Sequence, residues 1–341
     1  MKAAIYNPYF DTLGGGERYV ATVAKVLLEA GYKVDVEWKD SQLISKVKER
    51  FGIDLTEANI VKDINRGDGY DVCFWLSDGS IPTLRARKNI LHFQMPFSNV
   101  KGKTLLNKMK LARINKVICN SKFTKHYIDL EFGTKSIVVY PPVDIENFKS
   151  KSKNNLILSV GRFSQLTQAK NQEVLIKEFI KLVKTGMTNY RLILAGGSEI
   201  GGKEYVEILK KMSKGYPVEI LENPSFTKIK SLYGQAKIFW SASGYRVNEK
   251  INPKGVEHFG ITVVEAMAAG VVPVIYSAGG HKEIIKNNET GFLWKTLQEL
   301  KIVTKNVIQN RDLLSRVSKN ATKESQKYGY ERFKKELLRA I

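Results

Sequence analysis

The chain alternates short apolar runs with longer amphipathic segments, and the whole rhythm occurs twice. The run at 2–7 has the length of a buried strand, and the segment 17–30 places its apolar side chains at the spacing of one helix face. Further strands are predicted at 33–38, 70–76, 89–93, 116–120 and 136–140, and a helix at 121–132 with Ser121 as its N-cap.

The rhythm stops at Pro141, Pro142 and the polar run 149–155, none of which continues a strand or a helix. It restarts with strands predicted at 156–161, 190–195, 218–221, 237–241, 272–276 and 291–294, helices at 171–184, 205–212, 226–233 and 260–269, and a helical tail from Leu300. The predicted division is a first domain over 1–142, a linker over 143–155, a second domain over 156–322, and a C-terminal helix over 323–341 that is able to return to the first domain.

Strands that alternate with helices favour a parallel sheet covered by helices on both faces. The predicted fold class is therefore α/β, with two Rossmann-like domains. Ligands of such sheets bind outside the carboxyl ends of the strands, so chemistry is expected where a strand passes into the next helix.

The composition, 43% hydrophobic and 26% charged over 341 residues, is typical of a soluble globular protein. Cys73 and Cys119 each lie in an apolar run, as buried thiols do in a reducing cytosol. The N-terminal residues lack the apolar core of a signal peptide, and the apolar stretch 260–280 is interrupted by Glu265 and Pro273. We expect a cytoplasmic protein, either soluble or peripheral on the cytosolic membrane face.

The charge is strongly basic, with 55 Lys and Arg against 34 Asp and Glu, a net +21. Such a surplus favours an anionic partner, although it can also serve solubility alone. No acidic residue lies between Asp78 and Asp129, and within this stretch the segment 101–113 is basic and amphipathic. Its apolar side is formed by Leu105, Leu106, Met109 and Ala112. Two interpretations stay open: a surface that docks on anionic lipid, or a core-packed helix with a solvated face.

Three glycines, Gly14, Gly15 and Gly16, stand at the first strand-to-helix junction. Glycine permits positive φ and close approach of the backbone to a ligand, and the following helix offers amides and the positive end of its dipole. The pattern is neither the dinucleotide fingerprint nor a P-loop. We interpret it as a loop that embraces a phosphate or a sugar, with a plain tight turn as the alternative.

Two cations follow the first strand of the second domain. Arg162 stands at the carboxyl end of that strand, and Lys170 precedes the next predicted helix. A planar guanidinium and a compact ammonium at this place are able to clamp a diphosphate. The alternative is a solvated surface pair.

Two glutamates, Glu257 and Glu265, frame the start of the predicted helix 260–269. Glu265 has apolar neighbours, so an unpartnered carboxylate there would be costly, and it is placed to accept hydrogen bonds from vicinal hydroxyls such as those of a ribose. Glu257 precedes the helix and can reach a substrate at its N-terminus. The amides of Phe259, Gly260 and Ile261 are placed there to hold phosphate. The alternative is one capping and one surface glutamate.

Together these segments resemble the retaining glycosyltransferases of the GT-B architecture, family 4. The similar motifs occur in family order through most of the chain: Gly14-Gly15-Gly16-Glu17-Arg18, Asn120-Ser121-Lys122-Phe123-Thr124, Tyr140-Pro141-Pro142-Val143-Asp144, Gly161-Arg162-Phe163, Leu194-Ala195-Gly196-Gly197, the Glu257 and Glu265 pair, and Gly279-Gly280 with Glu283.

This resemblance implies an acceptor-binding first domain and a nucleotide-sugar-binding second domain that face a central cleft. Within the group, 14–18 and 257–261 look most like the α-1,2-mannosyltransferases that extend dolichol-linked oligosaccharides. The likeness implies GDP-mannose as donor, favoured over UDP-sugars, and a glycan or lipid-linked saccharide as acceptor. The chain departs from the group in its short first domain and in a local addition at 243–254.

The resemblance also implies roles for individual residues. Arg162 and Lys170 neutralise the donor diphosphate, and the glycine loop approaches the sugar phosphate. Glu257 contacts the transferred sugar, and Glu265 holds the ribose. His92, near the end of a first-domain strand, lies close to the reacting carbon, although a lone histidine is more often structural. No cofactor is implied, and no Asp-x-Asp pair marks a metal site.

Two other functions stay open. A nucleotide-sugar epimerase or a sugar phosphorylase shares this fold, although no motif marks the pyridoxal phosphate lysine of a phosphorylase. A nucleic-acid-binding protein needs stacking aromatics among its cations. Few are available in the basic stretch, namely Phe93, Phe97, Phe123 and Tyr127, so no nucleic-acid partner is expected.

Overall fold

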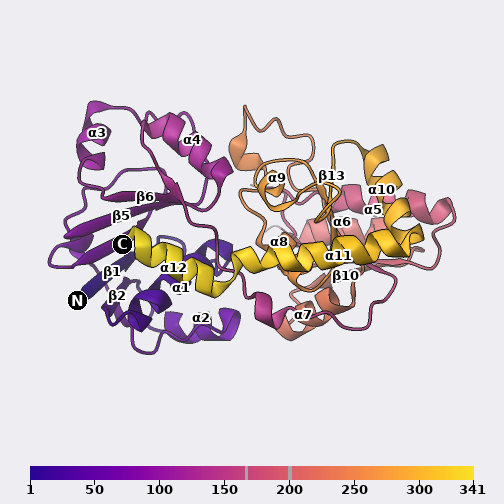
Figure 1. Cartoon of the computed structure of the whole chain (residues 1–341), viewed down its shortest axis with the longest axis horizontal. Coiled ribbons are helices and arrows are strands. Elements are labelled where there is room, and N and C mark those ends of the chain that lie inside the picture. The colour runs from indigo at the N-terminus through magenta and orange to yellow at the C-terminus, as the bar shows by residue number, and fades with distance from the viewer. Residues whose placement is uncertain (166–167, 199–201) are drawn as a thin grey trace. The chain divides into compact units, whose positions relative to one another are not determined.

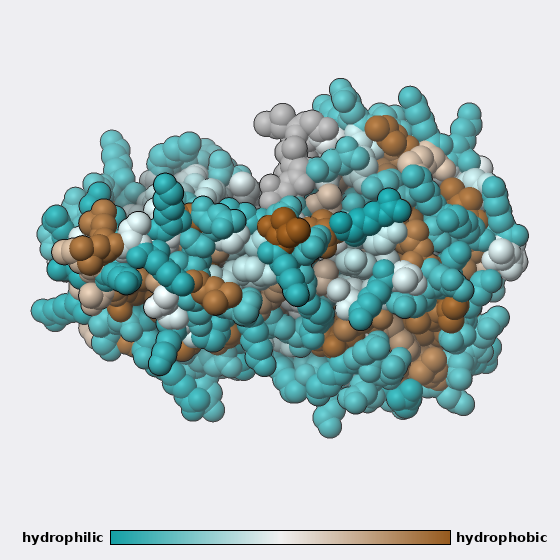
Figure 2. All heavy atoms as spheres, turned by 90° about the horizontal axis from the view of Figure 1, so that it is seen from above, coloured by the Kyte–Doolittle hydropathy of each residue, from teal (hydrophilic) through white to brown (hydrophobic). Residues whose placement is uncertain are grey.

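The computed structural model describes residues 1–165, 168–198 and 202–341. The chain forms two compact units (Figure 1): the first unit is Met1–Pro142 with Tyr330–Ile341, and the second unit is Val143–Gly329. Hydrophilic side chains cover most of the face seen in Figure 2, and the apolar ones lie in separate patches.

A seven-stranded parallel sheet forms the centre of the first unit, in the order β3-β2-β1-β4-β5-β6-β7. Its strands are β1 (Lys2–Tyr6), β2 (Lys33–Glu37), β3 (Asn59–Val61), β4 (Val72–Leu76), β5 (Lys88–Phe93), β6 (Lys116–Cys119) and β7 (Ile137–Val138). Its helices are α1 (Gly15–Glu29), α2 (Leu43–Phe51), α3 (Leu105–Leu111), α4 (Lys122–Phe132) and α12 (Tyr330–Ala340), with one 3-10 turn, Asn65–Gly67.

Burial explains why β1, β4 and β6 are nearly continuous apolar runs rather than alternating ones. Ala3, Ala4 and Ile5 of β1 have no exposed surface, because helices cover both faces of the sheet. The predicted N-cap is confirmed: the Ser121 hydroxyl accepts from the Thr124 amide at 3.0 Å and begins α4. The sequence prediction missed β3 and α2. β3 has only three residues and lies at the sheet edge, so its apolar run is short.

The second unit holds a six-stranded parallel sheet in the order β10-β9-β8-β11-β12-β13. Its strands are β8 (Leu156–Val160), β9 (Arg191–Gly196), β10 (Val218–Glu222), β11 (Ile238–Ser241), β12 (Val272–Tyr276) and β13 (Phe292–Trp294). Its helices are α5 (Gln172–Lys184), α6 (Gly202–Ser213), α7 (Phe226–Gln235), α8 (Ile261–Ala268), α9 (His281–Ile284), α10 (Leu297–Gln309) and α11 (Arg311–Ser325), with 3-10 turns at Ile145–Asn147, Pro253–Gly255 and Gln326–Tyr328.

The core of the second unit lies between this sheet and its helices. Phe179 of α5 meets Trp240 of β11 edge to face, with ring centroids 6.4 Å apart. The Trp240 indole donates to the Thr304 hydroxyl of α10 at 3.1 Å, which satisfies a buried donor inside the core. The predicted α/β fold with two Rossmann-like parallel sheets is confirmed.

The C-terminal helix α12 belongs to the core of the first unit. Phe333 is fully buried and packs edge to face on Tyr19 of α1, with ring centroids 5.0 Å apart. Figure 1 shows α12 beside α1. Leu337 is buried one turn later in the same cluster. The last helix therefore completes the first sheet's covering layer, although more than 180 residues of the second unit precede it in the sequence.

We expect the substitution Phe333→Ala to lower the free energy of unfolding of the first unit by roughly 3–5 kcal/mol, because it leaves a cavity in that core. Urea unfolding checks this, followed by the fluorescence of Trp38 and Trp75, which both lie in the first unit. Leu338→Ala on the same helix is the matched control, since Leu338 is 38% exposed. An equal loss in the two variants would contradict the packing role.

Candidate active site

The carboxyl edge of the second sheet gathers the charged residues that the sequence singled out. β8 leads into Gly161 and Arg162, β11 leads towards Ser243, and β12 ends at Tyr276. Because all strands run parallel, these three junctions lie at the same edge. Lys170 comes just before α5, and Glu257 comes just before α8.

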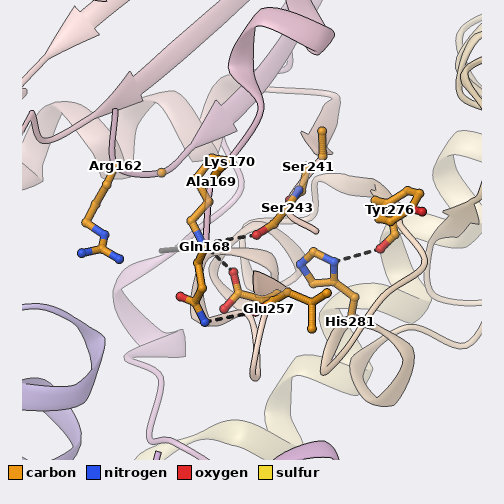
Figure 3. Close-up of polar contacts among 12 residues, drawn as sticks. Arg162, Gln168, Ala169, Lys170, Ser241, Ser243, Glu257, Tyr276 and His281 are labelled. Atoms are coloured by element: carbon orange, nitrogen blue, oxygen red, sulfur yellow. Dashed lines mark hydrogen bonds and ion pairs between the residues drawn. The ribbon is translucent and has the colours of Figure 1, made fainter. Parts of the chain in front are cut away.

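Lys170 and Glu257 form an ion pair at this edge (Figure 3). The Lys170 Nζ donates to Glu257 Oε2 at 2.8 Å and lies 3.4 Å from the Ser243 hydroxyl. The side chains are 19% and 18% exposed, so each retains a small surface through which a ligand can reach it. The sequence predicted both residues as ligand contacts, and the structure brings them together.

The Glu257 carboxyl group is ionised at neutral pH. Burial raises its pKa, but the positive charge of Lys170, the neighbouring His281 and the hydrogen bond from Lys170 outweigh burial and bring the pKa to about 2. The group therefore offers a fixed negative charge and cannot act as a general acid near pH 7.

A turn formed by Gly279 and Gly280 packs against the backbone of Glu257. The Gly280 amide donates to the Glu257 carbonyl at 2.8 Å. Gly279 has φ +53°, and a Cβ there would lie 2.1 Å from the same carbonyl oxygen, so only glycine fits. The His281 ring lies next to this turn with its Nδ1 2.9 Å from the Tyr276 carbonyl (Figure 3). Burial lowers the pKa of His281, and Glu257 opposes that shift.

Arg162 extends from the same edge and lies to one side of the Lys170–Glu257 pair (Figure 3). Its backbone is fixed by Gln172 of α5, whose side-chain amide donates to the Arg162 carbonyl at 2.9 Å. The Tyr205 hydroxyl of α6 lies 3.1 Å from Gln172 Oε1 and fixes that amide in turn. Two separated cations at one sheet edge suit the two phosphates of a diphosphate.

Glu265 lies on α8, which the sequence placed at 260–269 and the structure places at Ile261–Ala268. Gly260 caps the helix with φ +113°, and its carbonyl accepts from the Val263 amide at 3.0 Å. Phe259, Gly260 and Ile261 therefore surround a helix N-terminus, as predicted. The Glu265 carboxylate is buried and accepts from the Tyr233 hydroxyl of α7 at 3.1 Å, which fixes its orientation.

The glycine loop lies in the first unit, at the carboxyl end of β1, and differs from its prediction in one respect. Gly14 has φ −93°, and Gly15 and Gly16 begin α1, so the expected positive φ is wrong for this loop. Leu13 takes the left-handed conformation instead, at φ +43°. The cause is Glu17, whose carboxylate accepts from the Gly14 amide at 2.7 Å and begins the helix directly there.

Gly16 lies close to a protein side chain, Gln94, whereas the expected close approach of this loop to a ligand stays a prediction. Gln94 follows β5 and donates to the Gly16 carbonyl at 3.0 Å, and a Cβ on Gly16 would lie 2.1 Å from Gln94 Oε1. Asn120, which follows β6, donates to the Gln94 carbonyl at 3.0 Å. The sequence prediction missed Gln94, although a polar residue directly after a buried strand was the available signal.

His92 is fully buried in the core of the first unit. Its ring stacks on Tyr19, with centroids 4.1 Å apart, and its Nδ1 lies 3.1 Å from the Ile118 carbonyl. Burial lowers the pKa of His92 to about 3, so the ring is neutral. This burial favours the structural interpretation, and a contact between His92 and the reacting carbon stays a prediction.

Within residues 1–165, 168–198 and 202–341, no three His, Cys, Asp or Glu side chains lie close enough together to hold a metal ion. In the same part of the chain, no helix combines the length and the apolar composition that crossing a bilayer requires.

Curated relatives include enzymes that act on lipid-linked glycans. The family pattern described as glycosyl transferases group 1 matches residues 142–324. The GDP-Man:Man(3)GlcNAc(2)-PP-Dol alpha-1,2-mannosyltransferase of Dictyostelium discoideum is 29% identical over 244 residues, which cover 66% of this chain and 46% of the relative. The human protein of the same name is 32% identical over 195 residues, 52% and 38% of the two chains. The chain thus spans less than half the length of these relatives.

Other similar proteins match the chain over nearly its whole length. An uncharacterized glycosyltransferase of Methanocaldococcus jannaschii is 23% identical over 97% of this chain and 95% of its own. A glycosyltransferase structure from Rickettsia africae has a TM-score of 0.77 at 18% identity and covers 99% of this chain and 97% of its own. Anabaena HepE in complex with UDP has a TM-score of 0.78 at 19% identity and covers 99% of both. These two structures show the GT-B fold.

The family pattern covers more than half of the residues, including Arg162, Lys170, Glu257 and Glu265. This chain belongs to the glycosyl transferases group 1 family.

Proposed function

We propose that this glycosyltransferase moves mannose from GDP-mannose to a glycan or lipid-linked saccharide, with retention of configuration and without a metal ion. The observation that supports this most is the buried Lys170–Glu257 pair at the carboxyl edge of the second sheet. In this pair Lys170 is the cation that would bind phosphate, and Glu257 is the anion that would face the sugar. The two side chains are joined by one hydrogen bond.

The leaving group gains negative charge as the bond to the anomeric carbon breaks. Lys170, Arg162 and the first-turn amides of α8 supply positive charge and dipoles where that charge develops. Lys170 has three N–H donors, of which one is directed to Glu257 and one towards Ser243. The third is available to a phosphate oxygen, so a bound diphosphate does not need to break the ion pair.

In this proposal Glu257 lies beside the transferred sugar, which carries the positive charge as the bond breaks. As the leaving group departs, the transferred sugar becomes positively charged, and an ionised carboxylate beside it stabilises that charge. The acceptor hydroxyl then attacks from the face that the leaving group vacates, which retains the α configuration. The departing phosphate takes the hydroxyl proton, so no protein base of raised pKa is required.

Glu265 holds the nucleoside part of the donor in this proposal. Tyr233 donates to one carboxylate oxygen and fixes the group on α8. A carboxylate with a fixed orientation is able to accept from two vicinal hydroxyls, as a ribose presents them. The donor base and sugar follow the relatives named as GDP-Man-dependent mannosyltransferases, whereas HepE was crystallised with UDP.

Glu257→Gln keeps the shape of the side chain and removes its charge. We expect turnover to fall by about 100-fold or more, as for other preorganised electrostatic groups, while nucleotide binding persists. Single-turnover transfer and donor binding are measured in parallel. Glu219→Gln is the control, because Glu219 is an exposed carboxylate on β10. Unchanged turnover in Glu257→Gln would remove the proposed role.

Donor choice is testable by thermal stabilisation. A donor at 100 times its dissociation constant should add about 2.7 kcal/mol to the free energy of unfolding. We expect GDP and GDP-mannose to stabilise the chain at lower concentrations than UDP, UDP-glucose or ADP. Lys170→Gln should weaken the response to every diphosphate. A stronger response to UDP-glucose than to GDP-mannose would overturn the proposed donor and leave the reaction class in place.

Metal independence predicts that transfer continues in excess EDTA, because the positive charge at the diphosphate comes from Arg162, Lys170 and helix amides. Transfer is measured with and without chelator, and again after Mg²⁺ or Mn²⁺ is added back. Loss of transfer in chelator that either ion restores would contradict the proposal.

A further inference from the structure

Helix α3 exposes its large apolar side chains to solvent. Leu105, Leu106 and Met109 are 75%, 61% and 63% exposed, and the helix has no buried residue. The interpretation of segment 101–113 as a core-packed helix is therefore wrong for these three residues. Figure 2 shows apolar side chains gathered over α3 with hydrophilic ones around them. Apolar surface left in water at one place is typical of a docking site.

The ends of α3 are held firmly while its side chains face outward. The Glu131 carboxylate near the end of α4 accepts from the amides of Asn99, Val100 and Gly102 at 2.9–3.0 Å. Thr104 caps the helix, and the Arg113 Nε beyond it donates to the Leu84 carbonyl at 3.0 Å. The exposure of the apolar side chains is thus a consequence of the fold rather than of a loose segment.

Exposed cations surround this apolar group. Lys101, Lys103, Lys108 and Arg113 are exposed in the same segment, and Lys110 of α3 is half-buried. Four strands of the first sheet also begin with an exposed lysine: Lys2 of β1, Lys33 of β2, Lys88 of β5 and Lys116 of β6. Because the strands are parallel, these lysines lie together at the amino edge of the sheet, which we call the basic edge.

Three acidic side chains near the basic edge, Asp71, Glu131 and Asp129, are already engaged. Asp71 pairs with Arg87 at 3.0 Å and accepts from the Lys2 amide at 2.8 Å. Glu131 is bound by its three amides, and Asp129 pairs with Lys125. The cations of α3 and of the basic edge therefore leave a net positive surface.

We propose that α3 and the basic edge of the first unit dock on an anionic lipid bilayer, with Leu105, Leu106 and Met109 inserted between headgroups. Cations beside exposed aliphatic side chains match a surface that is anionic outside and apolar beneath. Nucleic acid would satisfy the cations but leave the aliphatic side chains in water, since its bases stack on aromatic rings. A second copy of the chain would bring the same positive charge against this face.

The test is co-sedimentation of the full chain with vesicles of phosphatidylcholine alone and with added phosphatidylglycerol, at low and at high salt. We expect binding to the anionic vesicles only, weakened by salt. Changing Lys103, Lys108 and Lys110 together to Gln should weaken that binding by about 100-fold. Changing Leu105, Leu106 and Met109 together to Ser should leave a weaker binding that high salt abolishes.

The matched control changes Lys203, Lys211 and Lys214 to Gln, which removes the same charge from exposed positions of the second unit. Equal binding to both vesicle types, or an equal loss in the control variant, overturns the proposal. The proposal is also overturned if an oligonucleotide displaces the wild-type chain from anionic vesicles and binds the serine variant as tightly as the wild type.

Thermal stabilisation by GDP-mannose is measured on the same variants. If the chain does not bind anionic vesicles but GDP-mannose still stabilises it, only the membrane-docking proposal is disproved. If the chain binds the vesicles but GDP-mannose does not stabilise it, the proposed donor is disproved and the docking surface stands.

Discussion

The Glu257 carboxylate lies where an unpaired charge would cost several kcal/mol, and the geometry of the second unit's site follows from how that cost is met. Lys170 meets most of it through a 2.8 Å hydrogen bond. Lys170 itself is mostly buried and needs Glu257 equally. Removing either partner would leave the other as an unpaired buried charge. The pair therefore holds Lys170, just before α5, against Glu257, before α8.

Close backbone contacts also hold the segment of Glu257 in place. Gly279 and Gly280 pack so closely on the segment of Glu257 and His258 that a Cβ at either glycine would lie 2.1 or 2.4 Å from a carbonyl oxygen of that segment. The Gly279 amide is held from the other side by the Glu249 carboxylate at 2.8 Å. Glu249 belongs to the segment 243–254, so this segment contacts the turn that supports the Glu257 carboxylate.

The sequence predicted the strands and junctions well because parallel sheets covered on both faces demand continuous apolar runs. It singled out Lys170 and Glu257 because charged side chains at the strand-to-helix junctions of a parallel sheet lie where ligands bind. It did not predict the contact of Gln94 with Gly16, or of Tyr233 with Glu265, because these pairs join elements far apart in the chain. Periodicity also shows which side chains share a face, but not whether the face is covered, which is why Leu105 needed the structure.

The two edges of the first sheet carry different chemistry, and the length of its strands separates them. The glycine loop and Gln94 lie at the carboxyl edge, whereas the four strand-initial lysines lie at the amino edge, where the Arg113 carbonyl just beyond α3 accepts from Asn89 of β5 at 2.9 Å. β5 has six residues, so at about 3.3 Å per residue the edges are roughly 20 Å apart. A bilayer held at the amino edge would leave the glycine loop away from the headgroups by about that distance. An acceptor attached to lipid would then have to extend across it, which a chain of several sugars does and a single sugar on a lipid phosphate does not.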